Sequence, residues 1–158
     1  MFAKYLLIFF VSMVPLVELR GSIVMAVGMG LDYWTSLAVC VLGNMLPVPL
    51  IYFFARKVLH WGADKKCIGK FFSYCLEKGE AAGHRLMKRA GRGGLFLALM
   101  LFVGIPIPGT GAWTGALVAS LFDMPKGKAM LSISAGVVSA GLIMTFGSQL
   151  VKFLVGLF

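Results

Sequence analysis

The chain has 158 residues, of which 59% are hydrophobic and 13% charged, and its net charge is +9. Charged residues make up about a quarter of an ordinary soluble domain, so this composition excludes that class and indicates an integral membrane protein. The chain is also too short to combine a membrane part with a separate soluble catalytic domain of about 100 residues. We therefore expect one all-α membrane domain over residues 1–158.

The first hydrophobic region, residues 5–31, is interrupted by the polar sequence Glu18-Leu19-Arg20-Gly21. At 1.5 Å per residue, each apolar arm beside it covers roughly 15–20 Å, whereas the hydrocarbon core is about 30 Å thick. Each arm is therefore about half a span. The pattern predicts a re-entrant helical hairpin with Pro15 and Gly21 at its tip.

Residues 33–55 form an uninterrupted apolar segment of 23 residues without a charged side chain. About 20 such residues suffice to cross a bilayer. We predict a transmembrane helix that Asp32 caps at its start and that Pro47 and Pro49 kink near its end.

Residues 56–92 contain ten Lys or Arg and three acidic residues, and so carry seven of the nine net positive charges. Basic loops beside membrane spans stay in the cytoplasm, so we place this segment there, in a protein of the plasma membrane. Its apolar residues recur at helical spacing, which predicts an amphipathic surface helix that contacts anionic lipid headgroups. The segment has no recognised nucleic-acid motif, and we expect no nucleic-acid partner.

The second interrupted region, residues 93–122, contains the sequence Pro106-Ile107-Pro108-Gly109-Thr110-Gly111. The prolines remove backbone donors and the glycines permit a tight reversal. The sequence predicts a second re-entrant hairpin, with a tip formed by Pro106, Pro108, Gly109 and Gly111. Irregular backbone at membrane depth must be buried in protein or line a watery cavity, so we expect the two tips to meet near the midplane. Two kinked full spans are the alternative.

A second uncharged segment of 23 residues, 129–151, follows the second hairpin, and Asp123 precedes it as the expected N-cap. The order of hairpin and then span thus occurs twice. Because each unit crosses the membrane once, the second unit must be inverted relative to the first. The fold class predicted is two inverted repeats, residues 1–55 and 93–158, joined by the basic connector 56–92.

The tips offer candidate binding groups. Arg20 has a planar fork of donors suited to phosphate or carboxylate, and half-helices that begin at the tips point free N–H groups to the same place. Glu18 is the only ionisable acid at depth and is the candidate for proton coupling. The predicted substrate-binding residues are Glu18, Arg20, Asn44, Thr110, Trp113 and Thr114.

Each of these residues also has a purely structural alternative. Glu18 and Arg20 can pair with each other and fix the tip. Asn44 can satisfy carbonyls that the prolines after it leave free, and Trp113 can serve as packing or as an interfacial anchor.

Three motifs carry a family resemblance, namely Pro15–Gly21, Gly43–Pro49 and Pro106–Gly115. Over residues 5–150 the chain resembles the small multi-drug export protein family, which implies a membrane exporter. Its duplicated layout is more distantly similar to the DedA superfamily of lipid flippases and scramblases. Those proteins have an acid at one proline hairpin and arginines at the other, whereas here Glu18 and Arg20 share the first hairpin.

We therefore expect a secondary transporter or flippase that moves an anionic amphiphile of the lipid-phosphate type. An exporter of small amphiphilic cationic drugs is the alternative, and a non-transporting assembly protein is a second one. The spans contain no Ser–His or paired-carboxylate arrangement, so we expect no enzymatic activity, no cofactor and no metal ion.

Two stripes of small residues recur at every fourth position: Gly111, Gly115 and Ala119, and Ser132, Gly136 and Ala140. Such stripes let helices approach closely. They predict close helix contacts and, together with the small size of the chain, a homodimer.

Overall fold

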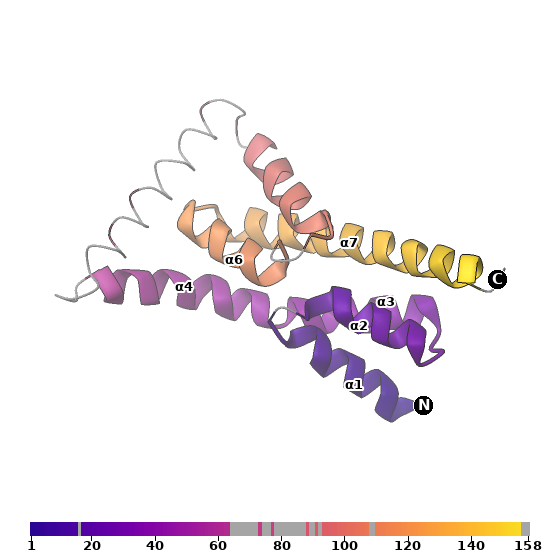
Figure 1. Cartoon of the computed structure of the whole chain (residues 1–158). Coiled ribbons are helices and arrows are strands. Elements are labelled where there is room, and N and C mark those ends of the chain that lie inside the picture. The colour runs from indigo at the N-terminus through magenta and orange to yellow at the C-terminus, as the bar shows by residue number, and fades with distance from the viewer. Residues whose placement is uncertain are drawn as a thin grey trace.

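The structure is a computed structural model that describes residues 1–15, 17–63, 93–107 and 110–155, and the single residues 73, 77, 88 and 91. The described residues form helices and no strands, so the predicted all-α class is confirmed for them. The predicted connector helix falls largely outside the described residues, as do Pro108 and Gly109. The helices are α1 (Phe2–Met13), α2 (Glu18–Gly28), α3 (Tyr33–Met45), α4 (Pro47–Ala63), Gly93–Gly104, α6 (Ala112–Leu121) and α7 (Lys126–Val155) (Figure 1).

Two segments are long and apolar enough to cross a membrane, Tyr33–Ala55 and Lys126–Val151. The first consists of α3 and the start of α4, which meet at Leu46. Pro47 begins α4 and has no backbone N–H, so the ladder of helical hydrogen bonds is interrupted there. The structure thus breaks the first span where the prolines predicted a kink.

The two aspartates before these spans differ in role. Asp32 caps α3, because its Oδ2 accepts a hydrogen bond of 2.8 Å from the backbone N–H of Thr35. Asp123 lies in a turn with a φ of 52°, three residues before α7 begins at Lys126. The prediction that Asp123 is an N-cap is therefore wrong, since the helix starts only after Pro125, whose carbonyl accepts the N–H of Ala129.

The Asp32 cap predicts a stability effect that depends on pH. Hydrogen bonds from the backbone N–H and then the hydroxyl of Thr35 hold the pKa of Asp32 below its ordinary value of 3.8. A lowered pKa adds stability above the unfolded-state pKa and loses it as the pH falls through the folded-state pKa. We expect Asp32→Ala to lower the Tm in detergent at pH 7 and the difference to shrink below pH 3.8. An equal difference at both pH values would contradict this account.

Both interrupted regions are broken helices. The chain reverses at Val14–Val17 between α1 and α2, and at Ile105–Gly111 between the Gly93–Gly104 helix and α6. The first reversal contains the predicted tip residue Pro15, but it ends before the polar sequence that was expected to form the tip. Gly21 is not a tip residue but lies in the first turn of α2, where its N–H donates to the carbonyl of Val17 at 2.9 Å. The polar sequence forms the first turn of α2, which begins at Glu18.

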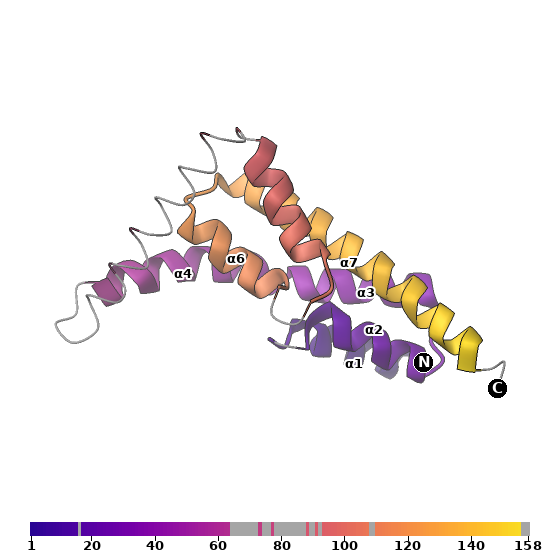
Figure 2. The same ribbon diagram turned by 45° about the horizontal axis from the view of Figure 1, so that its top comes forward.

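The two hairpins approach the centre from opposite ends of the molecule (Figures 1 and 2). The first packs against α3 and the C-terminal half of α7, and the second lies along α4 and the N-terminal half of α7. The helix directions in the second half run opposite to those of their counterparts in the first half. The two tips therefore face each other, while the long helices pass beside both. The inverted-repeat interpretation stays a prediction, and so does the choice between re-entrant hairpins and kinked full spans.

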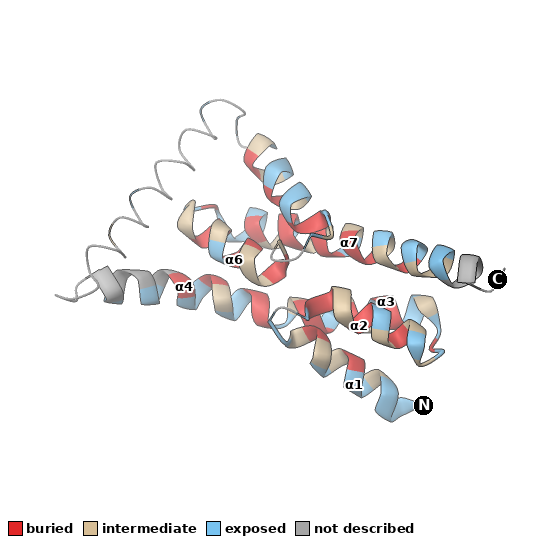
Figure 3. Cartoon of the chain, in the orientation of Figure 1, coloured by how far each residue is buried: buried red, intermediate tan, exposed pale blue. Residues whose placement is uncertain are grey.

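Burial follows this arrangement. Buried residues line the contacts between helices, and the outward faces are exposed (Figure 3). Those outward faces are strongly apolar, which is typical of a surface that meets lipid. Large exposed hydrophobic residues include Leu42, Leu50, Phe54, Leu131, Ile143 and Leu150.

The small-residue stripes are packed inside the chain. A Cβ atom at Gly136 would lie 2.7 Å from the Met100 carbonyl oxygen and from the Cβ of Val103, and one at Gly115 would lie 2.5 Å from a Val103 methyl. The predicted close helix contacts are confirmed. These stripes offer no free surface to a second copy, so the homodimer stays a prediction without their support.

We expect Gly136→Ala to lower the free energy of unfolding by about 1–3 kcal/mol, because the added methyl has no room. Gly147 is the matched control on the same helix, since a Cβ there meets nothing within 4 Å. Gly147→Ala should leave stability unchanged or raise it by about 0.4–1 kcal/mol. Thermal unfolding in detergent measures both, and equal effects would contradict the packing described here.

Candidate functional site between the hairpin tips

Arg20 extends from the first turn of α2 to the second hairpin. Its guanidinium donates to the Ile107 carbonyl, to the Ile105 carbonyl at 3.0 Å and to both the carbonyl and the hydroxyl of Thr110 at 3.2 and 3.0 Å. The carbonyl of Val103 lies 3.5 Å away. The last carbonyls of a helix have no partner within it and form its negative end. Arg20 thus caps the end of the Gly93–Gly104 helix.

Glu18 performs the opposite task at the start of α6. It is only 7% exposed, and its Oε1 accepts a hydrogen bond of 3.2 Å from the backbone N–H of Trp113, in the first turn of α6. The N-cap of α6, Gly111, has no side chain to do this. The carboxylate therefore caps the positive end of a helix that lies 95 residues further along the chain.

The close approach of Glu18 depends on a glycine. A Cβ atom at Gly111 would overlap the carboxylate of Glu18. Glu18 itself has a φ of 49°, in the left-handed region that residues other than glycine rarely adopt. The missing side chain at Gly111 and the left-handed backbone at Glu18 together bring the Glu18 carboxylate against the start of α6.

On the first hairpin, the negative Glu18 therefore binds the positive start of α6, and the positive Arg20 binds the negative end of the Gly93–Gly104 helix. The sequence offered two interpretations, an internal pair of Glu18 with Arg20 or an open anion site at Arg20. In the structure, the hydrogen bonds of both side chains lead instead to the second hairpin. The tips are joined by capping contacts between hairpins.

A cavity of about 10 Å³ remains at this junction. That volume is about the size of one water-sized probe, so it holds at most one water molecule. Asn44 lies at the cavity, is 2% exposed, and has a side-chain oxygen without a hydrogen-bond partner among the described residues. The lining residues are Glu18, Leu19, Arg20, Asn44, Val103, Gly111, Ala112, Val137 and Ala140.

The remaining predicted binding residues take different positions. Thr110 bonds to Arg20 and lies within 3.0 Å of two tip carbonyls. Trp113 reaches Glu18 through its backbone, and its indole N–H is buried without a partner in the described part of the chain. Thr114 donates to the Gly111 carbonyl at 3.1 Å, within its own helix. Among the described residues, no group of three or more His, Cys, Asp or Glu side chains could hold a metal ion.

The acceptors for Arg20 were missed by sequence reasoning. They are backbone carbonyls of Val103, Ile105 and Ile107, whose side chains are apolar. The available signal was Pro106, which ends the preceding helix, although the Ile105 carbonyl also accepts the N–H of Ile107 at 2.8 Å.

The fold and the site define a class, an all-helical membrane protein in which two broken-helix hairpins meet tip to tip between two long helices. Residues 18–143 match the family model described as Putative small multi-drug export protein. That match covers well over half of the chain, so the chain belongs to this family, and the resemblance inferred from its motifs is confirmed. The family description is that of an exporter and not of an enzyme.

No curated protein and no solved structure matches the chain. The more distant likeness to the DedA superfamily therefore stays a prediction.

Proposed function

We propose that this protein is a secondary transporter or flippase whose two hairpin tips open and close around Glu18 and Arg20, and that it moves an anionic amphiphile of the lipid-phosphate type. The proposal rests above all on one observation. Glu18 and Arg20, both on the first hairpin, cap the two helix ends that meet at the tip of the second hairpin. Ionisable residues at membrane depth are expensive and usually functional.

Each capping contact has a natural competitor. The guanidinium of Arg20 binds carbonyls here, but a phosphate is a stronger, bidentate acceptor for the same fork. The cavity is too small for a substrate, so we assign this conformation to a closed state. In our proposal, an anion binds Arg20 when the tips separate.

A proton competes for Glu18 in the same way. A protonated carboxyl group loses the charge that favours the positive end of α6. Protonation should therefore weaken the contact with Trp113 and favour opening, which is the basis on which we propose proton coupling.

The arrangement of the hairpins supports this architecture. Broken helices at membrane depth must be buried in protein or line a watery cavity. Here the two tips contact each other through Glu18 and Arg20, while Ile105 and Ile107 are exposed. Inverted halves with a site between them are a recurrent transporter design. Lys57, Lys126 and Lys128 are exposed at one end of the molecule, where α4 ends and α7 begins. By the charge rule for short loops we propose that this end faces the cytoplasm of a plasma-membrane protein.

The proposal predicts that Glu18→Gln abolishes acceleration of transport by a proton gradient. We would reconstitute the protein in liposomes and follow movement of a fluorescent lipid phosphate with and without the gradient. Asp32→Asn is the matched control, because Asp32 is an exposed acid at a helix start outside the site. An unchanged gradient response in Glu18→Gln would overturn proton coupling at this residue.

The family description favours a second candidate, export of small amphiphilic cationic drugs. In that case a released Glu18 would bind the cation, and Arg20 would only hold the closed state. The same liposomes separate the two candidates. Uptake of a cationic dye that Glu18→Gln abolishes, with no movement of lipid phosphate, would replace the first proposal with the second.

A further inference from the structure

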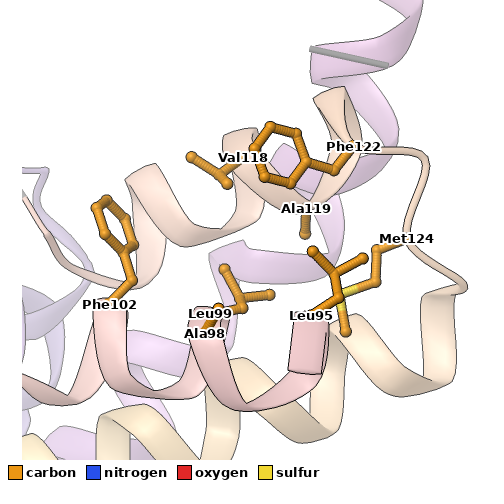
Figure 4. A pocket seen from close by; sticks show the side chains of 8 residues that line it. All are labelled: Leu95, Ala98, Leu99, Phe102, Val118, Ala119, Phe122 and Met124. Carbon is orange, nitrogen blue, oxygen red and sulfur yellow. The ribbon is translucent and has the colours of Figure 1, made fainter. Parts of the chain in front are cut away.

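The second hairpin contains a pocket that the tip site does not use. It has a volume of about 310 Å³ and lies between the Gly93–Gly104 helix and α6, with Met124 at its end (Figure 4). The side chains that line it are hydrocarbon apart from the sulfur of Met124. They include Leu95, Ala98, Leu99, Phe102 and Phe122.

The pocket is accessible from the outer face of the hairpin. Ala98 and Phe102 are exposed, whereas Leu95 and Leu99 form a buried floor. In a membrane protein an exposed apolar face meets lipid chains, and an apolar pocket gives water no hydrogen-bond partners. The medium that reaches this opening is therefore hydrocarbon, and the apolar lining suits an alkyl chain.

Two basic residues follow directly after the pocket. Lys126 and Lys128 are exposed in the first turn of α7. Lys126 is two residues beyond Met124, so their Cα atoms lie within about 8 Å of each other. The ammonium group of Lys126 lies 4.6 Å from the centre of the Phe53 ring on α4, and the neighbouring Tyr52 donates its hydroxyl to the Met124 carbonyl at 2.6 Å. A cationic group beside an apolar pocket complements a phosphate group joined to an alkyl chain.

We propose that the second hairpin and the start of α7 form a binding site for an anionic phospholipid, with one acyl chain in the pocket and the phosphate on Lys126 and Lys128. This site goes beyond the proposed transport and does not depend on it. The two sites share no lining residue, although Phe102 of the pocket directly precedes Val103 of the tip junction.

The test uses phosphatidylglycerol with a photoreactive group in one acyl chain, added to phosphatidylcholine vesicles that contain the protein. Mass spectrometry of the cross-linked peptides should find labelling at Phe102, Phe122 or Met124, and excess unlabelled phosphatidylglycerol should compete with it. Photoreactive phosphatidylcholine should label the same residues less. Labelling that cannot be saturated would overturn the site, and this readout needs no variant and no transport.

Variants separate the two halves of the site. Ala98→Trp fills the opening and should remove the saturable labelling. Leu97→Trp, an equally exposed neighbour that does not line the pocket, should keep it. If both variants lose the saturable labelling, or if neither does, the proposed acyl-chain site is overturned.

Replacing Lys126 and Lys128 by Gln should reduce the preference for phosphatidylglycerol by about fivefold per lysine. Lys4→Gln, an exposed lysine elsewhere, should leave it unchanged. Equal labelling by the two lipids in the native chain would overturn the assignment to an anionic lipid. Because this test measures lipid binding and not transport, a negative result would leave the proposal for the tip site unchanged.

Discussion

Arg20→Ala is expected to abolish transport and to lower the free energy of unfolding by about 3 kcal/mol or more. The guanidinium binds several carbonyl groups at the second tip, and a hydrogen bond to a charged group contributes about 1.5–3 kcal/mol. Its removal leaves those carbonyls and the buried carboxylate of Glu18 without their cation. Flux in proteoliposomes and thermal unfolding in detergent measure the two effects.

Lys4 provides the control for Arg20. Its ammonium donates to the carbonyl of Met29, after the end of α2, at 3.4 Å and in an exposed position. Lys4→Ala removes the same kind of contact on the surface and should change stability by no more than about 0.5 kcal/mol. Arg20→Lys keeps the charge but loses the fork, so its transport should be impaired as well. Normal transport of the anionic substrate by Arg20→Ala would refute the role of Arg20 as its binding group.

Gly111→Ala is expected to separate the tips with a single added methyl group. The new Cβ would occupy the position of the Glu18 carboxylate, and the shift must include the carboxyl carbon as well as both oxygens. Glu18 would then lose the N–H of Trp113. We expect a loss of about 1–3 kcal/mol in stability, the cost of an unsatisfied buried polar group, together with a defect in transport.

The control and a double variant make this prediction specific. Gly127 lies in the first turn of α7 with open space around a new Cβ, so Gly127→Ala should have little effect. In a chain that already carries Glu18→Ala, the methyl at Gly111 no longer meets a carboxylate, and Gly111→Ala should cost much less. Additive effects of the two changes would mean that Gly111 and Glu18 do not act on each other.

Much of the fold was predictable because it follows from the spacing of apolar and breaking residues. Uninterrupted apolar stretches gave the two long helices, Pro47 marked the break in the first of them, and the Pro-Gly sequence placed the second reversal correctly. The first reversal was predicted only in part, because it contains Pro15 but not Gly21. Charged residues indicate a turn by their polarity, but Glu18 and Arg20 lie in the first turn of α2, and both find partners on the other hairpin.

The candidate site was only partly predictable, for a reason of the same kind. Side-chain chemistry pointed to Arg20, Glu18 and Asn44, which do line one cavity. The partner of Glu18 and most partners of Arg20 are backbone groups, and a backbone N–H or carbonyl occurs at almost every position of the sequence. Which carbonyls become available depends on where a helix ends, and which of them Arg20 can reach depends on how two segments about 87 residues apart are packed.

The break at Leu46 has a mechanical consequence. The first hairpin packs on α3, and α6 of the second hairpin packs on α4, so the break divides the first long helix between the two hairpins. Asn44 at the tip junction lies only two residues before it. A change of angle at this break would rotate the first hairpin relative to α6 and pull the tips apart, and α7, which packs on both hairpins, would have to slide or bend with it. Spin labels on Leu42 and Leu117, one exposed position on each half, would record that rotation as a change in distance.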